Sequence, residues 1–325
     1  MPTIAVTRKI PEAGLQPLRE AGDLRLWPGD LPPNPQQLAE LLHGCDGALT
    51  MVNDKIDAAL LDAAPSLRVV STFAVGYDNI DVQAATSRGI AICNTPGVLT
   101  ESTADAAFSL LIAAARRIPE GIAYVREGQW RAWSPMVLLG HDIHGATVGI
   151  IGMGRIGQAF ARRARGFDMK ILYHNRERNL EAERELGAIY VPLDELLGQS
   201  DFVSLHVALN AETKGLIGAR ELGLMRREAI LINAARGPVI DTAALVTALQ
   251  EGTIGGAALD VTDPEPLPAT HPLVNLPNAI IVPHTASSTI ATRDKMASMA
   301  AHNLLAILNN EQPASIVNPT VLDRR

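Results

Sequence analysis

Three residues in the second half of the chain, Arg236, Glu265 and His284, have side chains suited to anion binding and proton transfer. A guanidinium is a planar cation that holds a carboxylate through paired hydrogen bonds. An imidazole exchanges a proton near neutral pH, and a carboxylate beside it can orient the ring and stabilise the imidazolium form. Beside a nicotinamide, this set fits hydride transfer to a 2-keto acid, with Arg236 binding the substrate's oxygens and His284 acting as general acid. Taken singly, each residue also fits a surface, capping or solvated-turn role.

The elements that must position these side chains are strands, because ligands of doubly wound sheets bind beyond the carboxyl ends of the strands. Short apolar runs alternate with helical patterns in two series, which predicts an α/β fold with parallel sheets covered on both faces. The strand candidates of the two series are 3–7, 24–27, 47–52, 67–74 and 90–93, then 147–151, 170–174, 202–207, 229–233, 257–261 and 279–282. Several residues that could bind a ligand stand at or just past the carboxyl ends of these strands, and their clustering predicts a cleft between two domains. They are Val75, Gly76, Gly152, Asn175, Arg176, Ala208, Arg236, Asp260 and His284.

The fragment VGIIGMGRIG contains the pattern G-x-G-x-x-G as Gly152, Gly154 and Gly157. A predicted buried strand precedes it and an amphipathic helix follows it, which is the context of a dinucleotide-binding turn. In such a turn Gly152 permits the tight bend, Gly154 lets the backbone approach a pyrophosphate, and Gly157 allows close helix–strand packing. The N–H groups at the helix start then face the phosphates. An ordinary strand–helix turn is the alternative.

The end of the next predicted strand indicates the form of the dinucleotide. NAD-selective sites usually place an Asp or Glu about 20 residues past the glycines, where it binds the ribose hydroxyls. This chain has Asn175 there, with Arg176 beside it and Arg178 two residues further on. A neutral residue next to a guanidinium suits a 2′-phosphate, so we expect NADPH and NADP to be preferred, with NADH and NAD left open as accepted alternatives. A solvated surface arginine is the other interpretation of Arg176.

Length and composition narrow the class of protein. A chain of 325 residues predicts two domains, and its 47% hydrophobic content is enough for two cores. The net charge of −7 argues against nucleic-acid binding. Two cysteines, Cys45 and Cys93, make neither a disulfide scaffold nor a zinc site, so we expect no metal. Because we find no signal peptide and no unbroken apolar stretch of about 20 residues, we expect a cytoplasmic protein that does not bind membranes.

Five fragments together resemble the D-isomer-specific 2-hydroxyacid dehydrogenases, and among them the glyoxylate/hydroxypyruvate reductases. They are STFAVGYDNID, VGIIGMGRIG, INAARGPVID, AALDVTDPEPLPATHPL and VPHTASST, and the match spans nearly the whole chain. The resemblance implies a flavodoxin-like substrate-binding domain, 1–98 with 286–325, and a central Rossmann dinucleotide-binding domain, 99–285. It also implies that the segment 118–145, which the sequence pattern predicts to be irregular, is a dimerisation arm, so we expect a homodimer.

The same resemblance assigns roles to individual residues. It implies that Arg236 binds the substrate carboxylate and that Glu265 and His284 form the acid/base pair. It also implies that the backbone N–H groups of Val75 and Gly76 hold the same carboxylate. The positions that match cofactor contacts are Thr103, Arg155, Ile156, Ala234 and Asp260.

Two further parts of the chain bear on the resemblance. In the arm, Trp133, or else Trp130, matches a tryptophan that reaches into the partner's active site and keeps it small, with interface packing alone as the alternative. After the catalytic His these reductases usually read Ile-Gly-Ser, whereas this chain has Thr285, Ala286 and Ser287. Ala286 therefore adds a methyl group near the expected nicotinamide, and Ser287 keeps a hydroxyl for a substrate contact.

The activity we expect is NADPH-dependent reduction of small 2-keto acids, glyoxylate to glycolate and hydroxypyruvate to D-glycerate. Another D-2-hydroxyacid dehydrogenase, or one of the phosphite or formate type, is the first alternative. Phosphite dehydrogenases resemble a pattern with a Lys near the loop of Val75, where this chain has Ala74 and Val75. A non-enzymatic dinucleotide-sensing corepressor is the second alternative, but such proteins usually carry additional peptide-binding and tail segments, which we do not expect here.

Overall fold

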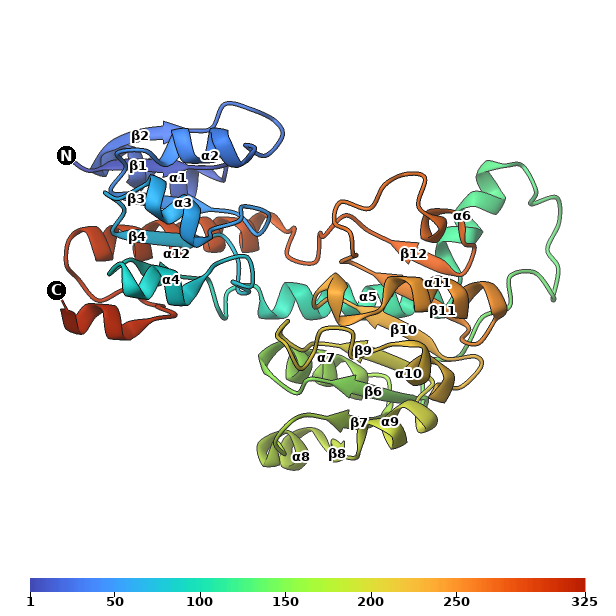
Figure 1. Cartoon of the computed structure of the whole chain (residues 1–325). Coiled ribbons are helices and arrows are strands. Elements are labelled where there is room, and N and C mark those ends of the chain that lie inside the picture. Colours follow the sequence, from blue (N-terminus) through green and yellow to red (C-terminus); the bar gives the residue numbers. More distant parts are fainter. Residues whose placement is uncertain (325) are drawn as a thin grey trace. The chain divides into compact units, whose positions relative to one another are not determined.

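The computed structural model of the chain describes residues 1–324 and divides into two compact units (Figure 1). Met1–Leu99 and the chain from Ser288 onward form the first unit, and Thr100–Ser287 form the second. The chain therefore leaves the first unit once and returns to it once.

The first unit is built on a parallel sheet of five strands in the order β2-β1-β3-β4-β5. This is the strand order of flavodoxin-like sheets. Strands β3, β4 and β5 are buried along their whole length, which explains their continuous apolar runs. The strands are β1 Thr3–Val6, β2 Asp23–Leu26, β3 Gly47–Thr50, β4 Val69–Thr72 and β5 Ala91–Cys93.

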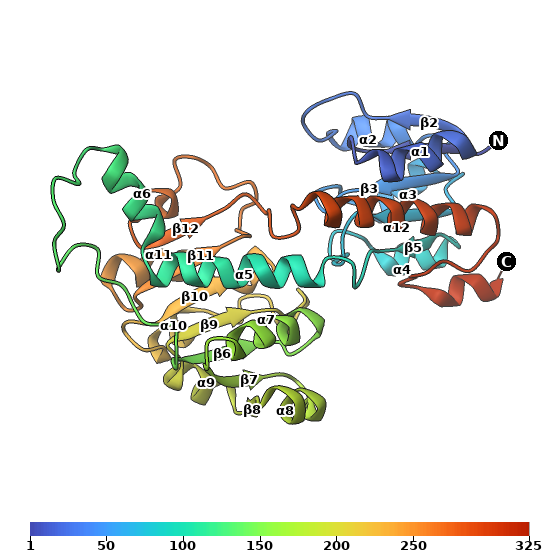
Figure 2. The same ribbon diagram turned by 180° about the vertical axis from the view of Figure 1, so that it is seen from behind.

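Helices cover both faces of this sheet (Figures 1 and 2). Helices α1, Glu12–Ala21, and α12, Ile290–Leu308, pack against each other on one face, where α12 also lies along β3 and β4. The opposite face shares a hydrophobic core with the remaining three helices. These are α2 Pro35–Leu42, α3 Ala58–Ala63 and α4 Val82–Ser87. The C-terminal helix α12 therefore belongs to the core of the first unit.

The second unit contains a parallel sheet of seven strands in the order β12-β11-β10-β9-β6-β7-β8. Counted along this unit, the order is the 3-2-1-4-5-6 arrangement of a Rossmann sheet with one further strand at the edge. The strands are β6 Thr147–Ile151, β7 Lys170–His174, β8 Ile189–Tyr190, β9 Phe202–Leu205, β10 Ile230–Asn233, β11 Gly256–Leu259 and β12 Ala279–Ile281. The predicted α/β class with two doubly wound parallel sheets is confirmed.

Two separate hydrophobic cores lie on the two faces of the second sheet. Helices α5, Thr100–Ala115, α7, Arg155–Arg165, and α8, Leu180–Leu186, contribute to the first core. The second core takes its side chains from α9 Leu193–Gln199, α10 Ala219–Leu224 and α11 Thr242–Glu251. The packing on both faces fixes the strands whose carboxyl ends carry the predicted site.

The structure differs from the sequence predictions in three places. The arm 118–145 is not irregular throughout, because helix α6, Ile118–Arg126, opens it. Ile118, Ile122 and Val125 recur at helical spacing, a signal that the sequence analysis did not use, and all three side chains are exposed in this chain. The two-residue strand β8 is too short to give a sequence pattern. Several predicted strands also end early; β4 stops at Thr72, because the chain there leaves the ladder to form the loops of the site.

Helix α12 is the longest helix in residues 1–324, with 19 residues. Its first two turns carry Arg293, Asp294 and Lys295. In the part of the chain that the structure describes, no helix combines the length and apolarity needed to cross a bilayer.

Candidate active site

His284 and Glu265 form a hydrogen-bonded pair in the second unit. The Nδ1 atom of His284 lies 2.6 Å from Oε1 of Glu265. Their side chains are 30% and 38% exposed, so the pair is partly shielded from water but not sealed in the core. An ionised carboxylate only accepts hydrogen bonds, so Nδ1 must carry the hydrogen, and Nε2 is the ring nitrogen that can face a substrate.

The surroundings of Glu265 keep its carboxylate ionised. Burial tends to raise its pKa, but the hydrogen bond and charge of His284, the N–H of Thr262 and the charge of Arg236 together hold the pKa below that of an ordinary glutamate. The guanidinium of Arg236 thus acts electrostatically on Glu265, and the three residues predicted to do the chemistry lie near one another. An ionised partner is what an imidazolium requires for stabilisation.

A left-handed turn presents His284, whose φ is +52°. Few residues other than glycine adopt this conformation, so the surroundings must hold it. The N–H of His284 donates to the carbonyl of Asp260 at 2.9 Å, and Oδ1 of Asp260 accepts from the N–H groups of Thr285 at 2.7 Å and Ala286 at 3.1 Å. Asp260 is buried, and this burial raises the pKa of its carboxyl against the opposing effect of those N–H groups. Asp260, which the resemblance indicated only as a cofactor contact, therefore builds the turn of His284.

Arg236 follows β10 in a turn that the sequence analysis did not explain. The buried side chain of Asn233 accepts from the N–H of Ala235 at 2.9 Å and donates to the carbonyl of Arg236 at 2.9 Å. A methyl group at Gly237 would overlap the carbonyl of Thr262, so this turn packs directly on the segment that leads to Glu265. Asn233 is thus a positioning residue that sequence reasoning missed, although an amide ending the apolar run ILIN was a visible signal.

The glycine turn lies between β6 and α7, and its three glycines have different surroundings. Gly152 has φ +99°, and an added Cβ would lie 2.7 Å from the carbonyl carbon of His206. A methyl group at Gly157 would overlap the carbonyl oxygen of Gly152. An added Cβ at Gly154, which caps α7, would meet nothing within 4 Å. Folding therefore requires glycine at the first and third positions, whereas Gly154 leaves an open backbone at a helix N-terminus, where phosphates bind.

His206, which directly follows β9, packs against this turn, because its backbone lies next to Gly152. Its ring nitrogen Nε2 lies 2.9 Å from the hydroxyl of Ser204, and burial lowers the pKa of His206 to about 3. The ring is therefore neutral at physiological pH and serves packing beneath Gly152 rather than proton transfer.

The two arginines after β7 have different partners. Arg178 is bound to Glu183 through Nη2 at 2.6 Å and Nε at 3.0 Å. Arg176 is 81% exposed, and its guanidinium lies 3.8 Å from the carboxylate of Glu212. Asn175 donates its amide to the carbonyl two residues further on, which shapes the turn. Arg176 is accordingly the guanidinium that can move onto a phosphate, while Arg178 is held by its carboxylate.

The other residues expected to contact the cofactor also belong to the second unit. Thr103 on α5 and Ala286 after His284 are buried, and Ala234 follows β10 directly. The partly or fully exposed ones are Arg155, Ile156, Ala208, Ala234 and Ser287.

Val75 and Gly76 lie in the first unit, just past β4. The buried Asn94 donates its amide to the carbonyl of Val75 at 2.8 Å, and its amide oxygen accepts from the hydroxyl of Ser315 at 2.6 Å. The carbonyl of Ala74 accepts from the N–H of Thr95 at 2.8 Å. The loop 73–76 is therefore held by the end of β5.

Trp133 and Trp130 stand on the arm and are 82% and 64% exposed. The arm starts after α5 and ends before β6, so within the second unit it extends from the amino ends of the strands (Figure 1). His284 and the glycine turn lie at the carboxyl ends, and the fold does not bring either tryptophan to them.

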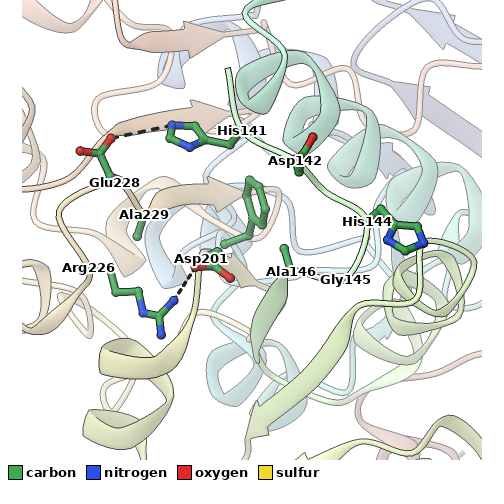
Figure 3. Close-up of a pocket in the computed structure, with 10 residues that line it drawn as sticks. His141, Asp142, His144, Gly145, Ala146, Asp201, Arg226, Glu228 and Ala229 are labelled. Atoms are coloured by element: carbon green, nitrogen blue, oxygen red, sulfur yellow. Dashed lines mark hydrogen bonds and ion pairs between the residues drawn. The ribbon is translucent and has the colours of Figure 1, made fainter. Parts of the chain in front are cut away.

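A cavity of about 290 Å³ lies at the same amino edge (Figure 3). Two pairs of polar side chains face each other in it, with Arg226 2.6 Å from Asp201 and His141 3.9 Å from Glu228. No predicted site residue lines this cavity. Within residues 1–324, no group of three or more His, Cys, Asp and Glu side chains is arranged to hold a metal ion.

The sequence of this chain is similar to a family of known enzymes over most of its length. Residues 108–286 match the model of the D-isomer specific 2-hydroxyacid dehydrogenase NAD binding domain. The glyoxylate reductase of Korarchaeum cryptofilum (strain OPF8) is 52% identical over 325 residues, covering 100% of this chain and 98% of the relative. That of Thermococcus gammatolerans is 50% identical over 325 residues, covering 99% and 97%.

Solved structures agree with this match over nearly the whole chain. A protein of Thermus thermophilus aligns with a TM-score of 0.91 and 47% identity, covering 97% of this chain and 99% of that chain. The NADPH-dependent glyoxylate/hydroxypyruvate reductase of Sinorhizobium meliloti, in complex with NADP and malonate, aligns with a TM-score of 0.88 and 36% identity, covering 98% and 97%. The chain belongs to the D-isomer specific 2-hydroxyacid dehydrogenase family of NAD(P)-dependent oxidoreductases.

Proposed function

We propose that this enzyme uses NADPH to reduce small 2-keto acids, glyoxylate to glycolate and hydroxypyruvate to D-glycerate. The observation that carries the proposal is the 2.6 Å contact between His284 and Glu265 within the field of Arg236. The names of the Korarchaeum and Thermococcus relatives support glyoxylate as a substrate. The Sinorhizobium relative, which is named NADPH-dependent and was solved with NADP, supports the cofactor.

In this proposal the guanidinium of Arg236 binds the carboxylate and carbonyl oxygens of the substrate, because its forked N–H donors can bind two oxygens at once. Its charge also stabilises the negative charge that develops on the carbonyl oxygen during reduction. The backbone N–H groups of Val75 and Gly76 bind the same carboxylate, and the hydroxyl of Ser287 is a further substrate contact.

His284 is the general acid. Its Nε2 gives a proton to the carbonyl oxygen while the carbonyl carbon accepts a hydride, so the keto group becomes an alcohol and the imidazolium becomes neutral. The ring then takes a proton from solvent, and in oxidation it accepts the hydroxyl proton instead. Glu265 holds Nδ1 throughout, which fixes the ring orientation and leaves Nε2 for the substrate.

The glycine turn fits a dinucleotide, because the backbone at Gly154 is open at the start of α7. A bound nicotinamide supplies the hydride in this reaction. We assign the 2′-phosphate to Arg176, next to the neutral Asn175, with Arg178 as a fixed cation nearby. The methyl group of Ala286 borders the nicotinamide. Other assigned cofactor contacts are Thr103, Gly152, Arg155, Ile156, Gly157, Ala208, Ala234 and Asp260.

We further assign substrate binding to the first unit, dinucleotide binding to the second, and homodimer formation to the arm. The support for the dimer is the apolar surface of α6 and the segment after it, where Ile122, Val125, Trp133 and Met136 are all exposed. Large exposed apolar patches of this kind mark protein interfaces. Trp133 would then enter the partner's active site.

Alanine substitutions at two glycines should separate cofactor binding from folding. Gly154→Ala leaves Tm unchanged, because the added methyl meets nothing within 4 Å. It raises KM for NADPH by roughly tenfold or more, about 1.4 kcal/mol, because the methyl occupies the space of the pyrophosphate. Gly157→Ala lowers Tm, since overpacking costs about 1–3 kcal/mol. An unaltered KM for NADPH in Gly154→Ala would contradict the assignment of this turn.

Removing Arg176 should weaken the preference for NADPH. One charge-assisted hydrogen bond contributes about 1.5–3 kcal/mol, so Arg176→Ala is expected to reduce the NADPH:NADH ratio of kcat/KM by roughly 10–150-fold. The ratio is measured with glyoxylate and with hydroxypyruvate as the keto-acid substrate, each with NADPH and with NADH. Arg184→Ala, which removes another exposed arginine from the nearby α8, is the control and should leave the ratio unchanged. A wild-type enzyme that uses NADH as well as NADPH would remove the role given to Arg176.

His284→Ala should abolish most of the reduction without affecting cofactor binding. Loss of a general acid lowers kcat by roughly 10²–10⁴-fold. Stopped-flow absorbance at the nicotinamide band measures turnover, and fluorescence titration measures the Kd of NADPH, which should stay near the wild-type value. A kcat close to that of the wild type would reject the acid role.

A further inference from the structure

We propose that Arg293 is a positioning residue for the loop 73–76 in the first unit and thereby sets the affinity for the keto acid. The inference rests on the proposed function, in which Val75 and Gly76 of this loop bind the substrate carboxylate. Arg293 lies in the first turn of α12, and no motif of the sequence analysis includes it.

The guanidinium of Arg293 lies over the first side chain of the loop. Its Cζ is 5.7 Å from the centroid of the Phe73 ring, within the range of a cation–π contact. Phe73 is 7% exposed and directly follows β4, and its N–H donates to the carbonyl of Thr50 at 2.8 Å. Because the ring is shielded from water, the attraction of the cation to its face is stronger than at an exposed site.

The same guanidinium binds the chain where it re-enters the first unit. Nη2 of Arg293 lies 2.9 Å from the hydroxyl of Ser288, the first residue of the returning segment. Thr289, the next residue, caps α12 by accepting from the N–H of Thr292 at 3.1 Å. One side chain therefore fixes the start of the loop relative to the returning chain.

Helix α12 holds the loop at a second point. The hydroxyl of Ser71 on β4 donates to the carbonyl of Ala300 at 2.8 Å, which seats the helix along the strand. The buried Asn303 donates to the carbonyl of Asn94 at 3.1 Å, and Asn94 in turn binds the carbonyl of Val75. Loss of Arg293 would therefore remove the side-chain contact at the Phe73 end of the loop while the backbone hydrogen bonds of Phe73 and Val75 stay, so we expect a displaced loop rather than an unfolded unit.

Arg68 offers a matched control in the same unit. It binds the opposite end of α12, with Nη1 3.1 Å from the carbonyl of Leu308 and Nη2 2.8 Å from the side chain of Asn310. Both arginines tie α12 to the unit, but the groups that Arg68 binds lie at the C-terminal end of the helix, away from the loop.

The experiment compares Arg293→Gln, Arg293→Lys and Arg68→Gln in the full-length enzyme. With NADPH in excess, Arg293→Gln should raise KM for glyoxylate by roughly tenfold or more, about 1.4 kcal/mol. Its KM for NADPH should stay within about twofold, since a lost substrate contact raises the KM of that substrate alone. Arg293→Lys keeps a cation near the ring and should recover part of the affinity. Arg68→Gln should lower Tm and leave both KM values unchanged.

A double-substitution cycle tests the route through Phe73. Phe73→Leu keeps an apolar side chain but removes the ring face, so adding Arg293→Gln to it should raise KM less than the same change does in the wild type. Additive effects, or an unchanged KM for glyoxylate in Arg293→Gln, would overturn the inference while the proposed function stands. A wild-type enzyme that reduces no 2-keto acid would overturn both, and this shows before any variant is compared.

Discussion

The hydrogen bond between Nδ1 of His284 and the ionised carboxylate of Glu265 is the interaction on which the proposed chemistry depends. Only with Nδ1 engaged is Nε2 the nitrogen that meets a substrate, and only an ionised Glu265 can act as this acceptor. The sheet makes the pair possible. Arg236, Glu265 and His284 follow β10, β11 and β12, which are adjacent parallel strands, so their carboxyl ends deliver all three residues to one edge.

Holding this pair requires conformations that folding alone would not favour. A left-handed residue other than glycine costs about 1–3 kcal/mol unless its surroundings fix it. Here the buried carboxylate of Asp260 accepts hydrogen bonds from the N–H groups of Thr285 and Ala286. The backbone carbonyl of Asp260 accepts a hydrogen bond from the N–H of His284. The side chain of Asn233 holds the turn of Arg236 in the same way, by hydrogen bonds to the backbone of Ala235 and Arg236. The reactive side chains are thus presented by turns that are themselves fixed by buried polar residues.

The sequence predicted the sheets well and the turns poorly, for a physical reason. Buried parallel strands such as β6 and β10 are continuous runs of apolar residues, so the local sequence is enough to predict them. The glycine turn is predictable because its glycines have a fixed spacing. The turn of His284 depends on contacts between residues 24 to 26 positions apart, which a local pattern does not show. Helix α6 was missed although Ile118, Ile122 and Val125 recur at helical spacing; these side chains are exposed in this chain. The residues past the strand ends could be predicted from the sequence, but the hydrogen bonds by which Asp260 holds the turn of His284 could not.

The most direct test of the account is the pH–rate profile of Glu265→Gln. The pKa of Glu265 lies below that of an ordinary glutamate, so its carboxylate stays ionised at neutral pH, and the substitution removes the negative charge that contacts Nδ1 of His284. We expect the basic limb of kcat/KM for glyoxylate reduction to move to lower pH by roughly one unit or more. Asp263→Asn, which removes a nearby exposed carboxylate, should leave the limb in place. A limb that stays where it is in Glu265→Gln would contradict the central claim.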